Sequence, residues 1–387
     1  MSATSSSLSF PALSQSQLQQ QGAVWTAAEI AQQPAMWRQL AAQSQQPQLR
    51  DWLQSLLAIP QLRIILTGAG TSAYIGQTLL PHLLQNSSVA SQRIEAISTT
   101  DIVSNPAQYL SAALPTLLIS YGRSGNSPES VAAVQLAEQL IPQCYHLVIS
   151  CNAKGQLAQL AQQQANSKVW LLPEACHDRS FAMTSSFTGM LLSTLLLLSP
   201  DEAELQAAIE AAQTLLADVR PLRQLAEQPC QRMVFLGSGC LKGIAQEAAL
   251  KYLELTAGQV LSCFESPLGF RHGPKSLVDA STQLLLLPSA DPYTRRYEVD
   301  LWHELKQDNK ALLTTLLQLP QGGPQQDVWQ ALPYIVFAQT LAFYKALQLG
   351  ISPDNPCPGG EVNRVVQGVH IYPFAAAASQ LQPDRGD

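Results

Sequence analysis

The feature that most constrains the fold is a short apolar strand that runs into a glycine turn and then a helix, and that occurs twice. The first copy starts at Leu62 and ends in Gly68 and Gly70, and the second ends in Gly237 and Gly239, with the same spacing between the glycines. A strand that feeds a helix through a tight glycine turn is the building unit of parallel α/β sheets. We therefore expect a duplicated α/β unit.

Short apolar runs alternate with helical patterns through both halves. This favours an α/β fold with two doubly wound, flavodoxin-like parallel-sheet subdomains in tandem. Strands are predicted at residues 62–66, 116–120, 146–150, 168–172, 233–236, 283–287 and 312–319. The predicted domains are an N-terminal arm with helices (1–60), a first α/β domain (61–200), a helical connector (201–230), a second α/β domain (231–350) and a C-terminal tail that closes the site (351–387).

Three local signals predict features outside the sheets. Residues 1–22 are rich in Ser and Gln and are expected to form a loosely ordered arm. Thr26 and Glu29 have the spacing of a capping box at the start of a helix. Residues 369–372 form a possible short strand within the tail.

Charge and cysteine usage argue against several classes of protein. The net charge is −6 and no block of Lys or Arg stands out, so nucleic acid is not expected as a partner. The seven cysteines are scattered without a C-x-x-C pair, which argues against a disulfide framework and a zinc site. The N-terminus lacks a secretory signal, and the apolar run 187–198 is too short to span a bilayer. We expect a cytoplasmic protein with no membrane partner.

Two turns rich in Ser and Thr follow predicted strands and open helices. The residues there that could bind an anion are Thr71, Ser72, Arg123, Ser124 and Ser127. Helix N-termini offer free N–H groups to phosphate, and parallel sheets bind ligands at the carboxyl edge of their strands. The first turn lacks the endings of a Walker loop and of a dinucleotide fingerprint. The alternatives are a tight turn without ligand for the first, and plain helix caps for the second.

Two further patterns are candidates for proton transfer. Glu247, Lys251 and Glu254 stand at i, i+4 and i+7, which places them on one face of a helix. There they could tune one another's pKa for acid–base work, although a solvated salt-bridge row has the same spacing. His272 lies in a loop, residues 265–275, that is rich in ionisable groups. Its imidazole can move protons near neutral pH, the alternative being an exposed loop histidine.

Together these motifs resemble the sugar isomerase (SIS) domain family and, in architecture, the isomerase half of glucosamine-6-phosphate synthase. The resemblance covers residues 62–372, and the order of the motifs along the chain makes it specific. The motifs are Gly70-Thr71-Ser72, Ser124-Gly125-Asn126-Ser127, Ala182-Met183-Thr184-Ser185, Glu247 with Lys251 and Glu254, and Arg271-His272-Gly273-Pro274.

The resemblance implies a role for each motif. The two turns of the first half would hold a sugar phosphate. Glu254 would move a proton between C1 and C2, with Glu247 and Lys251 beside it. His272 would open the sugar ring and would come from a second subunit, which implies at least a homodimer with shared active sites. Further substrate contacts are expected from Thr184, Ser185, Arg364 and Gln367.

Two departures from the synthase are expected to matter. Because only residues 1–61 precede the first predicted strand, we expect no glutamine-hydrolysing domain, and ammonia that is released or used free. Gln367 stands where the synthase carries a tail lysine that contacts the sugar. Arg364 could take over part of the role of that lysine.

Within the family, residues 178–186, 247–258 and 265–276 look most like AgaS-type proteins. That resemblance implies deamination and isomerisation of galactosamine 6-phosphate to tagatose 6-phosphate and ammonia, with no metal and no cofactor. Two enzymatic alternatives are a glucosamine-6-phosphate deaminase and a fructosamine-6-phosphate deglycase. An alternative of another class is a non-catalytic regulator that senses sugar phosphates. Its usual DNA-binding helix-turn-helix region is disfavoured by the few Lys and Arg of the N-terminal segment.

Overall fold

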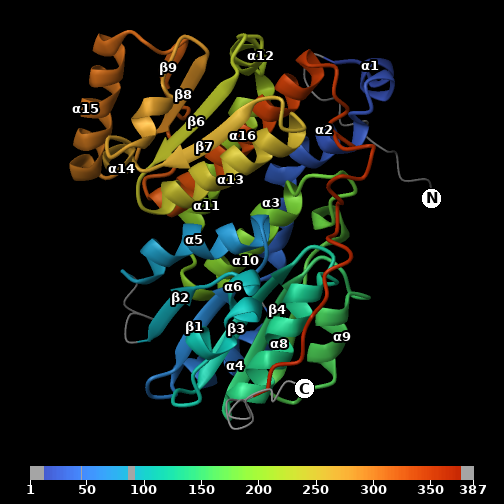
Figure 1. The fold of residues 1–387 in the computed structure, drawn as a ribbon. Helices are drawn as coiled ribbons and strands as arrows, with labels where there is room; N and C mark the ends of the chain where they lie inside the picture. The colour runs from blue at the N-terminus through green and yellow to red at the C-terminus, as the bar shows by residue number, and fades with distance from the viewer. Residues whose placement is uncertain (1–12, 45, 86–91, 376–387) are drawn as a thin grey trace, which may run out of the picture.

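The computed structural model describes residues 13–44, 46–85 and 92–375, which build two parallel sheets stacked along the molecule (Figure 1). The strands of the first sheet are β1 (Arg63–Thr67), β2 (Arg93–Ala96), β3 (Thr116–Gly122), β4 (Cys144–Ser150) and β5 (Ser167–Leu171). The strands of the second sheet are β6 (Arg232–Gly237), β7 (Leu261–Glu265), β8 (Thr282–Leu287) and β9 (Leu313–Leu316).

Helices pack around both sheets and join them. Four precede the first strand, namely α1 (Gln15–Gln20), α2 (Val24–Ala31), α3 (Gln33–Gln43) and α4 (Pro47–Leu57). The first half contains α5 (Thr71–Leu83), α6 (Thr99–Ser104), α7 (Pro106–Tyr109), α8 (Pro128–Leu140), α9 (Gln156–Gln162) and α10 (Ser185–Leu198). The connector contains α11 (Glu202–Ala217) and α12 (Arg220–Ala226). The second half contains α13 (Cys240–Leu255), α14 (Pro267–Phe270), α15 (Pro292–Asp308) and α16 (Asp327–Gln348).

Both sheets follow the strand order of a flavodoxin-like fold. The first is ordered β2-β1-β3-β4-β5 and the second β7-β6-β8-β9, and every neighbouring pair is parallel. The order 2-1-3-4-5 is a doubly wound arrangement that binds ligands where the strand order reverses. The predicted fold class, two doubly wound sheets in tandem, is therefore confirmed. The domain boundaries stay predictions.

The sequence carries no clear strand signal at β2 or β7, and both lie at the edge of a sheet. Each is only partly buried, with an exposed first residue, Arg93 in β2 and Leu261 in β7. Edge strands pair on one side only and often carry polar residues, so their apolar signal is weak. The apolar run 187–198 lies in α10, whose residues are all buried. No helix of the described residues is long and apolar enough to cross a membrane.

The predicted capping box is wrong, because its two residues bind partners far away in the sequence. The helix α2 already begins at Val24, so Thr26 and Glu29 lie inside it. Both the N–H and the hydroxyl of Thr26 donate to Asp354 at 2.7 Å. The Glu29 carboxylate accepts from the N–H groups of residues 179 and 180. The two residues of the S/T-x-x-E pattern therefore make tertiary contacts in place of capping bonds.

The C-terminal tail forms no helix or strand over residues 350–375, so the possible strand at residues 369–372 is wrong. It runs from the second half back along the first sheet and past α8 (Figure 1). Gln139 of α8 donates to the carbonyl of Phe374 at 3.0 Å. Residues 1–12 of the predicted arm lie outside the described residues, and the described part of it contains α1.

The two halves meet where α5 packs against α13. Gly243 of α13 lies directly against Thr78 of α5: a Cβ at this glycine would come within 2.6 Å of the Thr78 hydroxyl and 2.7 Å of its backbone nitrogen. Because backbone cannot move aside as a flexible side chain can, this position requires glycine for the two helices to approach closely.

We predict that Gly243→Ala destabilises the protein by about 1–3 kcal/mol, the usual cost of overpacking a tight interface. In an ordinary helix interior the same change is stabilising by about 1 kcal/mol, so the sign of the effect is diagnostic. Thermal or urea unfolding measures it. A variant that is as stable as the wild type would contradict the close crossing.

Candidate active site

A cavity of about 310 Å³ lies at the carboxyl edge of β1 and β3. Five parts of the chain line it: the turn after β1, the turn after β3, the loop before α10, the face of α13 around Lys251, and the tail at residues 362–366. This is the edge at which doubly wound sheets bind ligands. The pocket therefore gathers the two Ser- and Thr-rich turns and the ionisable helix face that the sequence singled out.

The turn after β1 presents an open helix N-terminus. Gly70 has φ 53° and ψ −127°, a conformation that favours glycine, and α5 begins at the next residue without a side-chain cap among the described residues. Thr71 and Ser72 both line the pocket and are otherwise buried. The first N–H groups of a helix and two hydroxyl side chains thus lie at the same pocket, an arrangement that suits an anion.

The turn after β3 adds two serines from the start of α8. The hydroxyl oxygen of Ser124 accepts the N–H of Asn126 at 3.2 Å, which leaves its own proton to donate. Ser127 is the cap residue of α8 but makes no side-chain cap bond, and its hydroxyl donates to Ser130 at 2.6 Å. The N-terminus of α8 is therefore also open toward the pocket. Of the two serines, Ser124 is the freer donor.

Arg123 lines the same pocket, but its guanidinium is already bound to the backbone. It donates to the carbonyl of Phe181 at 3.0 Å and to that of Arg364 at 2.6 Å. Burial, and then the charge of Arg364 nearby, lowers the pKa of Arg123 from its ordinary value. Arg123 thus ties the tail to the pocket and supplies positive charge there, while both its terminal nitrogens have partners.

The ionisable residues of α13 form one buried cluster. Lys251 is 1% exposed in its side chain and forms an ion pair with Glu254, and its Nζ lies 3.5 Å from an oxygen of Glu247. Glu254 lines the pocket, whereas Glu247 is fully buried behind it. Neither oxygen of Glu247 makes a hydrogen bond of ordinary geometry within the described residues. The alternative of a solvated salt-bridge row does not hold.

Burial and the charges of neighbouring groups shift the pKa values within this cluster. Burial raises the pKa of Glu247 to about 8, against the opposing effect of Lys251. For Lys251, burial lowers the pKa, but the two carboxylates outweigh it and the net shift is upward. Near neutral pH the cluster therefore holds a protonated Glu247 beside a charged Lys251, and Glu254 faces the pocket. A pocket-facing carboxylate next to a fixed ammonium suits a general base.

Two further predicted contact residues, Thr184 and Ser185, do not reach the pocket. Both are fully buried and bind the carboxylate of Asp178, Thr184 through N–H and hydroxyl and Ser185 through N–H. Asp178 thereby caps the start of α10. Through these contacts the two residues hold the loop at residues 178–183, and Phe181 and Met183 of this loop line the pocket.

The two predicted tail residues differ in their placement. Arg364 lines the pocket, and its side chain donates to the carbonyls of Asp178 and Ser180. Gln367 is exposed and lies outside the lining of the cavity. The tail is therefore anchored through Arg364, and it covers the pocket with the residues on either side of this arginine.

His272 lies apart from the pocket within a single chain. It is exposed, lies two residues after the end of α14, and is not among the residues that line the cavity. Its neighbours in the loop, Arg271 and Lys275, both pair with Glu304 of α15 and so hold the loop against the second half. A role for His272 in the pocket of the same chain is not supported by this position.

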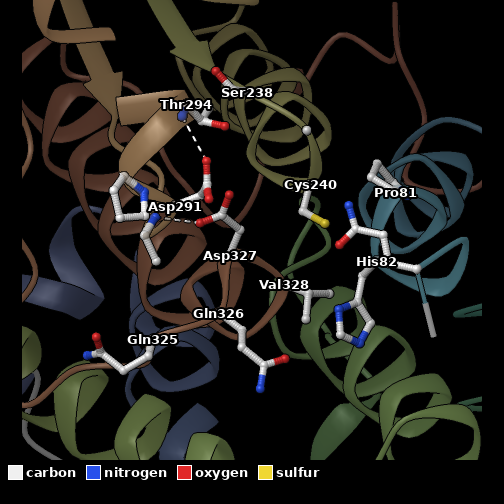
Figure 2. A pocket seen from close by; sticks show the side chains of 14 residues that line it. Pro81, His82, Ser238, Cys240, Asp291, Thr294, Gln325, Gln326, Asp327 and Val328 are labelled. Atoms are coloured by element: carbon white, nitrogen blue, oxygen red, sulfur yellow. Dashed lines mark hydrogen bonds between the residues drawn. The ribbon is translucent and has the colours of Figure 1, made fainter. Parts of the chain in front are cut away.

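A second cavity, of about 630 Å³, duplicates the first one at the second sheet (Figure 2). It is lined by the turn at Gly239, whose φ of 52° and ψ of −124° match those of Gly70. Its opposite wall carries His82 and Gln85 of α5. His82 and Gln85 precede Lys251 and Glu254 by the same number of residues that separates the two glycine turns. Each pocket is thus made from one half's turn and the other half's first helix.

The second cavity has lost the chemistry of the first. Cys240 and Leu241 stand at the offset of Thr71 and Ser72, so both hydroxyls are missing. The cap residue of α15 is Asp291, whose carboxylate accepts the N–H of Thr294 at 2.8 Å where α8 has an open serine (Figure 2). Asp327 adds a second carboxylate, bound to Ser289 and Ala290. Carboxylates already fill these helix N-termini, so a phosphate would be repelled.

Several lining residues were missed by the sequence analysis. Tyr74, Phe181, Met183 and Val366 line the first pocket without any motif that marks them. The one available signal was position, since Phe181 and Met183 adjoin the motif at residues 182–185. The contacts of Glu29 with the loop at residues 179 and 180 could not be found from the sequence, because they join residues about 150 positions apart.

Two parallel sheets whose first helices cross, with open helix N-termini at the carboxyl edge of the first sheet, define a doubly wound α/β protein whose first pocket suits an anion. Residues 57–200 match the model of the SIS domain. The chain belongs to the SIS domain family of sugar isomerases, as its relatives also show.

Relatives cover nearly the whole chain. It is 59% identical to D-galactosamine-6-phosphate deaminase AgaS of Shewanella sp. (strain ANA-3), over 94% of this chain and 95% of that protein. It is 42% identical to the crystal structure of tagatose-6-phosphate ketose/aldose isomerase from Escherichia coli, with a TM-score of 0.84 over 91% of this chain and 97% of that one. The C-terminal domain of glucosamine-fructose-6-phosphate aminotransferase from Francisella tularensis shares the fold, with 17% identity and a TM-score of 0.69 over 86% of this chain and 98% of that one.

We predict that each chain binds one sugar phosphate and that Ser124→Ala weakens this binding by about ten- to a hundredfold. A hydrogen bond to a charged oxygen contributes roughly 1.5–3 kcal/mol. Ser238→Ala, in the duplicated cavity, is the matched control and should leave the affinity unchanged. Isothermal titration with a hexosamine 6-phosphate measures both. Equal affinities in the two variants would show that the turn after β3 does not hold the phosphate.

A second prediction concerns Glu247. Because its folded pKa lies near 8 rather than at the usual 4.5, the folded protein keeps a proton that the unfolded chain has released across this window. The free energy of unfolding should therefore fall as pH rises through it, at up to about 1.4 kcal/mol per pH unit. Glu247→Gln cannot ionise, so its stability relative to the wild type should increase from pH 5 to pH 9.

Denaturant unfolding at several pH values tests this expectation. Glu361→Gln, which removes an exposed carboxyl of the tail, serves as the control and should show no such trend. A stability difference between Glu247→Gln and wild type that stays constant over the range would mean that Glu247 is not protonated in the folded protein.

Proposed function

We propose that this protein is a galactosamine-6-phosphate deaminase and isomerase, which converts the amino sugar phosphate and water into tagatose 6-phosphate and ammonia. The observation that carries the proposal is the single pocket in which an open phosphate cradle faces the Lys251–Glu254 pair. The names of the most similar relatives support the choice of substrate. The activity is an aldose–ketose isomerisation in which the amino group leaves as ammonia.

The phosphate would anchor the substrate at the two helix N-termini. Ser124 and the N–H groups at the start of α5 and α8 would bind its oxygens, with Thr71, Ser72 and Ser127 around them. The guanidinium groups of Arg123 and Arg364 add positive charge without giving up their backbone partners. Anchored in this way, the carbon skeleton can extend toward Glu254 on the opposite wall.

Proton transfer would be the work of Glu254. In the open-chain sugar, the carboxylate removes the proton from C2 and gives an enolamine, and the same proton is returned to C1. The charged Lys251 forms an ion pair with Glu254. It would hold the carboxylate in place and stabilise charge on the substrate. Glu247 is a positioning residue in this scheme, because it contacts Lys251 and lies behind the pocket wall.

Deamination then needs only water. The product of reprotonation is a 2-imine, to which water adds at C2, and the carbinolamine expels ammonia to leave the C2 ketone. The atoms balance with one water consumed and one ammonia released. The substrate's own carbonyl and imine delocalise the charge, so the mechanism requires no metal or redox cofactor. A panel of hexosamine 6-phosphates assayed for ammonia release would distinguish galactosamine 6-phosphate from glucosamine 6-phosphate and fructosamine 6-phosphate.

Ring opening would be carried out by His272 of a second subunit in a homodimer. Its exposed position away from the pocket of its own chain supports this arrangement. Leu268 of α14, close to His272 in the chain, is also an exposed apolar side chain that a second chain could cover. We place the reaction in the cytoplasm, an inference supported by cysteines that are all free thiols.

We predict that Glu254→Gln abolishes ammonia release but keeps substrate binding. The amide preserves the shape of the carboxyl while removing the base, and general-base catalysis contributes about 10²–10⁴-fold to such a step. Steady-state assays with titration of the substrate measure the two effects separately. Lost binding with retained turnover per bound substrate would contradict the role of Glu254.

We further predict that His272→Asn slows turnover of the cyclic sugar and that mixing it with Glu254→Gln restores activity. After subunit exchange, mixed dimers would contain one intact site, built from Glu254 of one chain and His272 of the other. Ammonia release before and after exchange measures the recovery. If exchange is demonstrated by tagged subunits and no activity returns, the shared site is wrong, while the proton-transfer role of Glu254 is not affected.

A further inference from the structure

Three side chains of different ligand type converge at the end of the first sheet that lies away from the pocket. They are Glu138 in the last turn of α8, and Cys144 and His146 at the start of β4. The Sγ of Cys144 lies 3.4 Å from the Nε2 of His146, and this Nε2 lies 2.6 Å from the Oε1 of Glu138. All three ligand atoms lie within 4.8 Å of one another.

Local structure explains why they meet. Cys144 and His146 are two residues apart in a strand, so their side chains point to the same face, and both are buried. Asn166, just before β5, donates to the Glu138 carboxylate at 2.9 Å and to the carbonyl of Cys144 at 2.8 Å. It thereby holds the end of α8 against the start of β4, so the trio is fixed by helix, strand and loop together.

We propose that Glu138, Cys144 and His146 form a site for a zinc ion, with solvent water as the fourth ligand, although the spacing of the cysteines alone predicts no zinc site. A thiolate, an imidazole and a carboxylate are the three side-chain ligands that zinc takes in proteins, and three protein ligands with one water is a common set. Hard ions such as magnesium and calcium prefer all-oxygen sites and fit this trio poorly.

The distances suit a tetrahedral ion after a small movement. With bonds of about 2.0–2.3 Å, tetrahedral ligand atoms lie roughly 3.3–3.7 Å apart, which the sulfur–nitrogen distance of 3.4 Å already meets. The nitrogen–oxygen distance of 2.6 Å must lengthen. Glu138 can provide this movement because its side chain is 34% exposed, and the same exposure gives the ion and its water a way in.

Binding would exchange protons for the ion. The thiol of Cys144 loses its proton to solvent, and the hydrogen that His146 Nε2 shares with Glu138 is replaced by the metal. The other ring nitrogen, Nδ1, is buried and has no hydrogen-bond partner among the described residues. Without a partner there to orient the ring, the affinity should be lower than that of a structural site with four protein ligands.

The ion would act as a clip and not as a catalyst. Cys144 begins β4 and Ser150 ends it, so the length of the strand separates the trio from the carboxyl edge that holds the pocket. The clip would fix the last turn of α8, and the N-cap at the other end of this helix is Ser127 of the pocket. A ligand that binds only the folded state raises its stability, so zinc should raise the melting temperature without changing turnover.

Metal titration of the full-length protein tests the proposal. Protein freed of metal with a chelator and then dialysed is titrated with zinc chloride, and the melting temperature and bound zinc are measured. Cobalt chloride serves as a spectroscopic probe, since a thiolate ligand gives a charge-transfer band in the near ultraviolet. We expect a rise in melting temperature with zinc, and a cobalt band that is lost in Cys144→Ser and kept in the control Cys263→Ser.

Glu138→Gln is the decisive variant, because it changes an exposed side chain and should not impair folding. We expect at least a tenfold weaker zinc affinity for it. Three results would each overturn the proposal: no saturable zinc binding to the wild type, an unchanged cobalt band in Cys144→Ser, or an unchanged affinity in Glu138→Gln. A change of ammonia release on adding zinc or chelator would also overturn it, since the ion would then act at the pocket.

Discussion

The candidate site depends on the crossing of α5 and α13. Each helix starts at the glycine turn of its own half and ends over the turn of the other half, because the two pass each other at Gly243 and Thr78. This contact brings Lys251 and Glu254, which belong to the second half, to the phosphate cradle of the first. Neither half alone contains both a cradle and a pocket-facing carboxylate. The duplication therefore contributes to the candidate site mainly through the place where the first helices of the two halves cross.

The same crossing generates two pockets, and their different chemistry follows from a few side chains. In the first, serines leave the helix N-termini open and a lysine balances two glutamates. In the second, Asp291 caps α15 directly, and His82 and Gln85 stand where the lysine and the pocket-facing glutamate would be. The backbone of the two glycine turns is nearly identical, so the two pockets differ through their side chains and not through their scaffold.

Sequence reasoning could predict what repeats or lies close together in the chain. The buried strands β1, β3, β4, β6 and β8 and the i, i+4, i+7 row on α13 have local signatures, and the structure contains all of them. Such a prediction was wrong where residues with a local signature make a tertiary contact instead. Thr26 and Glu29 have the spacing of a capping box, yet they bind Asp354 and the loop at residue 180. Thr184 and Ser185 look like ligand contacts yet bind Asp178, because a buried carboxylate must find donors within the protein.

The tail shows how the pocket is closed and why that closure is coupled to charge. Arg123 donates to the carbonyl of Arg364, and Arg364 donates to the carbonyls of Asp178 and Ser180, so two guanidinium groups lie close together at the pocket wall. Burial, and then the repulsion from Arg364, lowers the pKa of Arg123, and the carboxylates of Asp178 and Glu254 only partly offset these effects. A phosphate bound beside them would supply the missing negative charge. By linkage, whatever such an anion adds to the stability of the closed tail, the closed tail adds equally to the affinity for the anion.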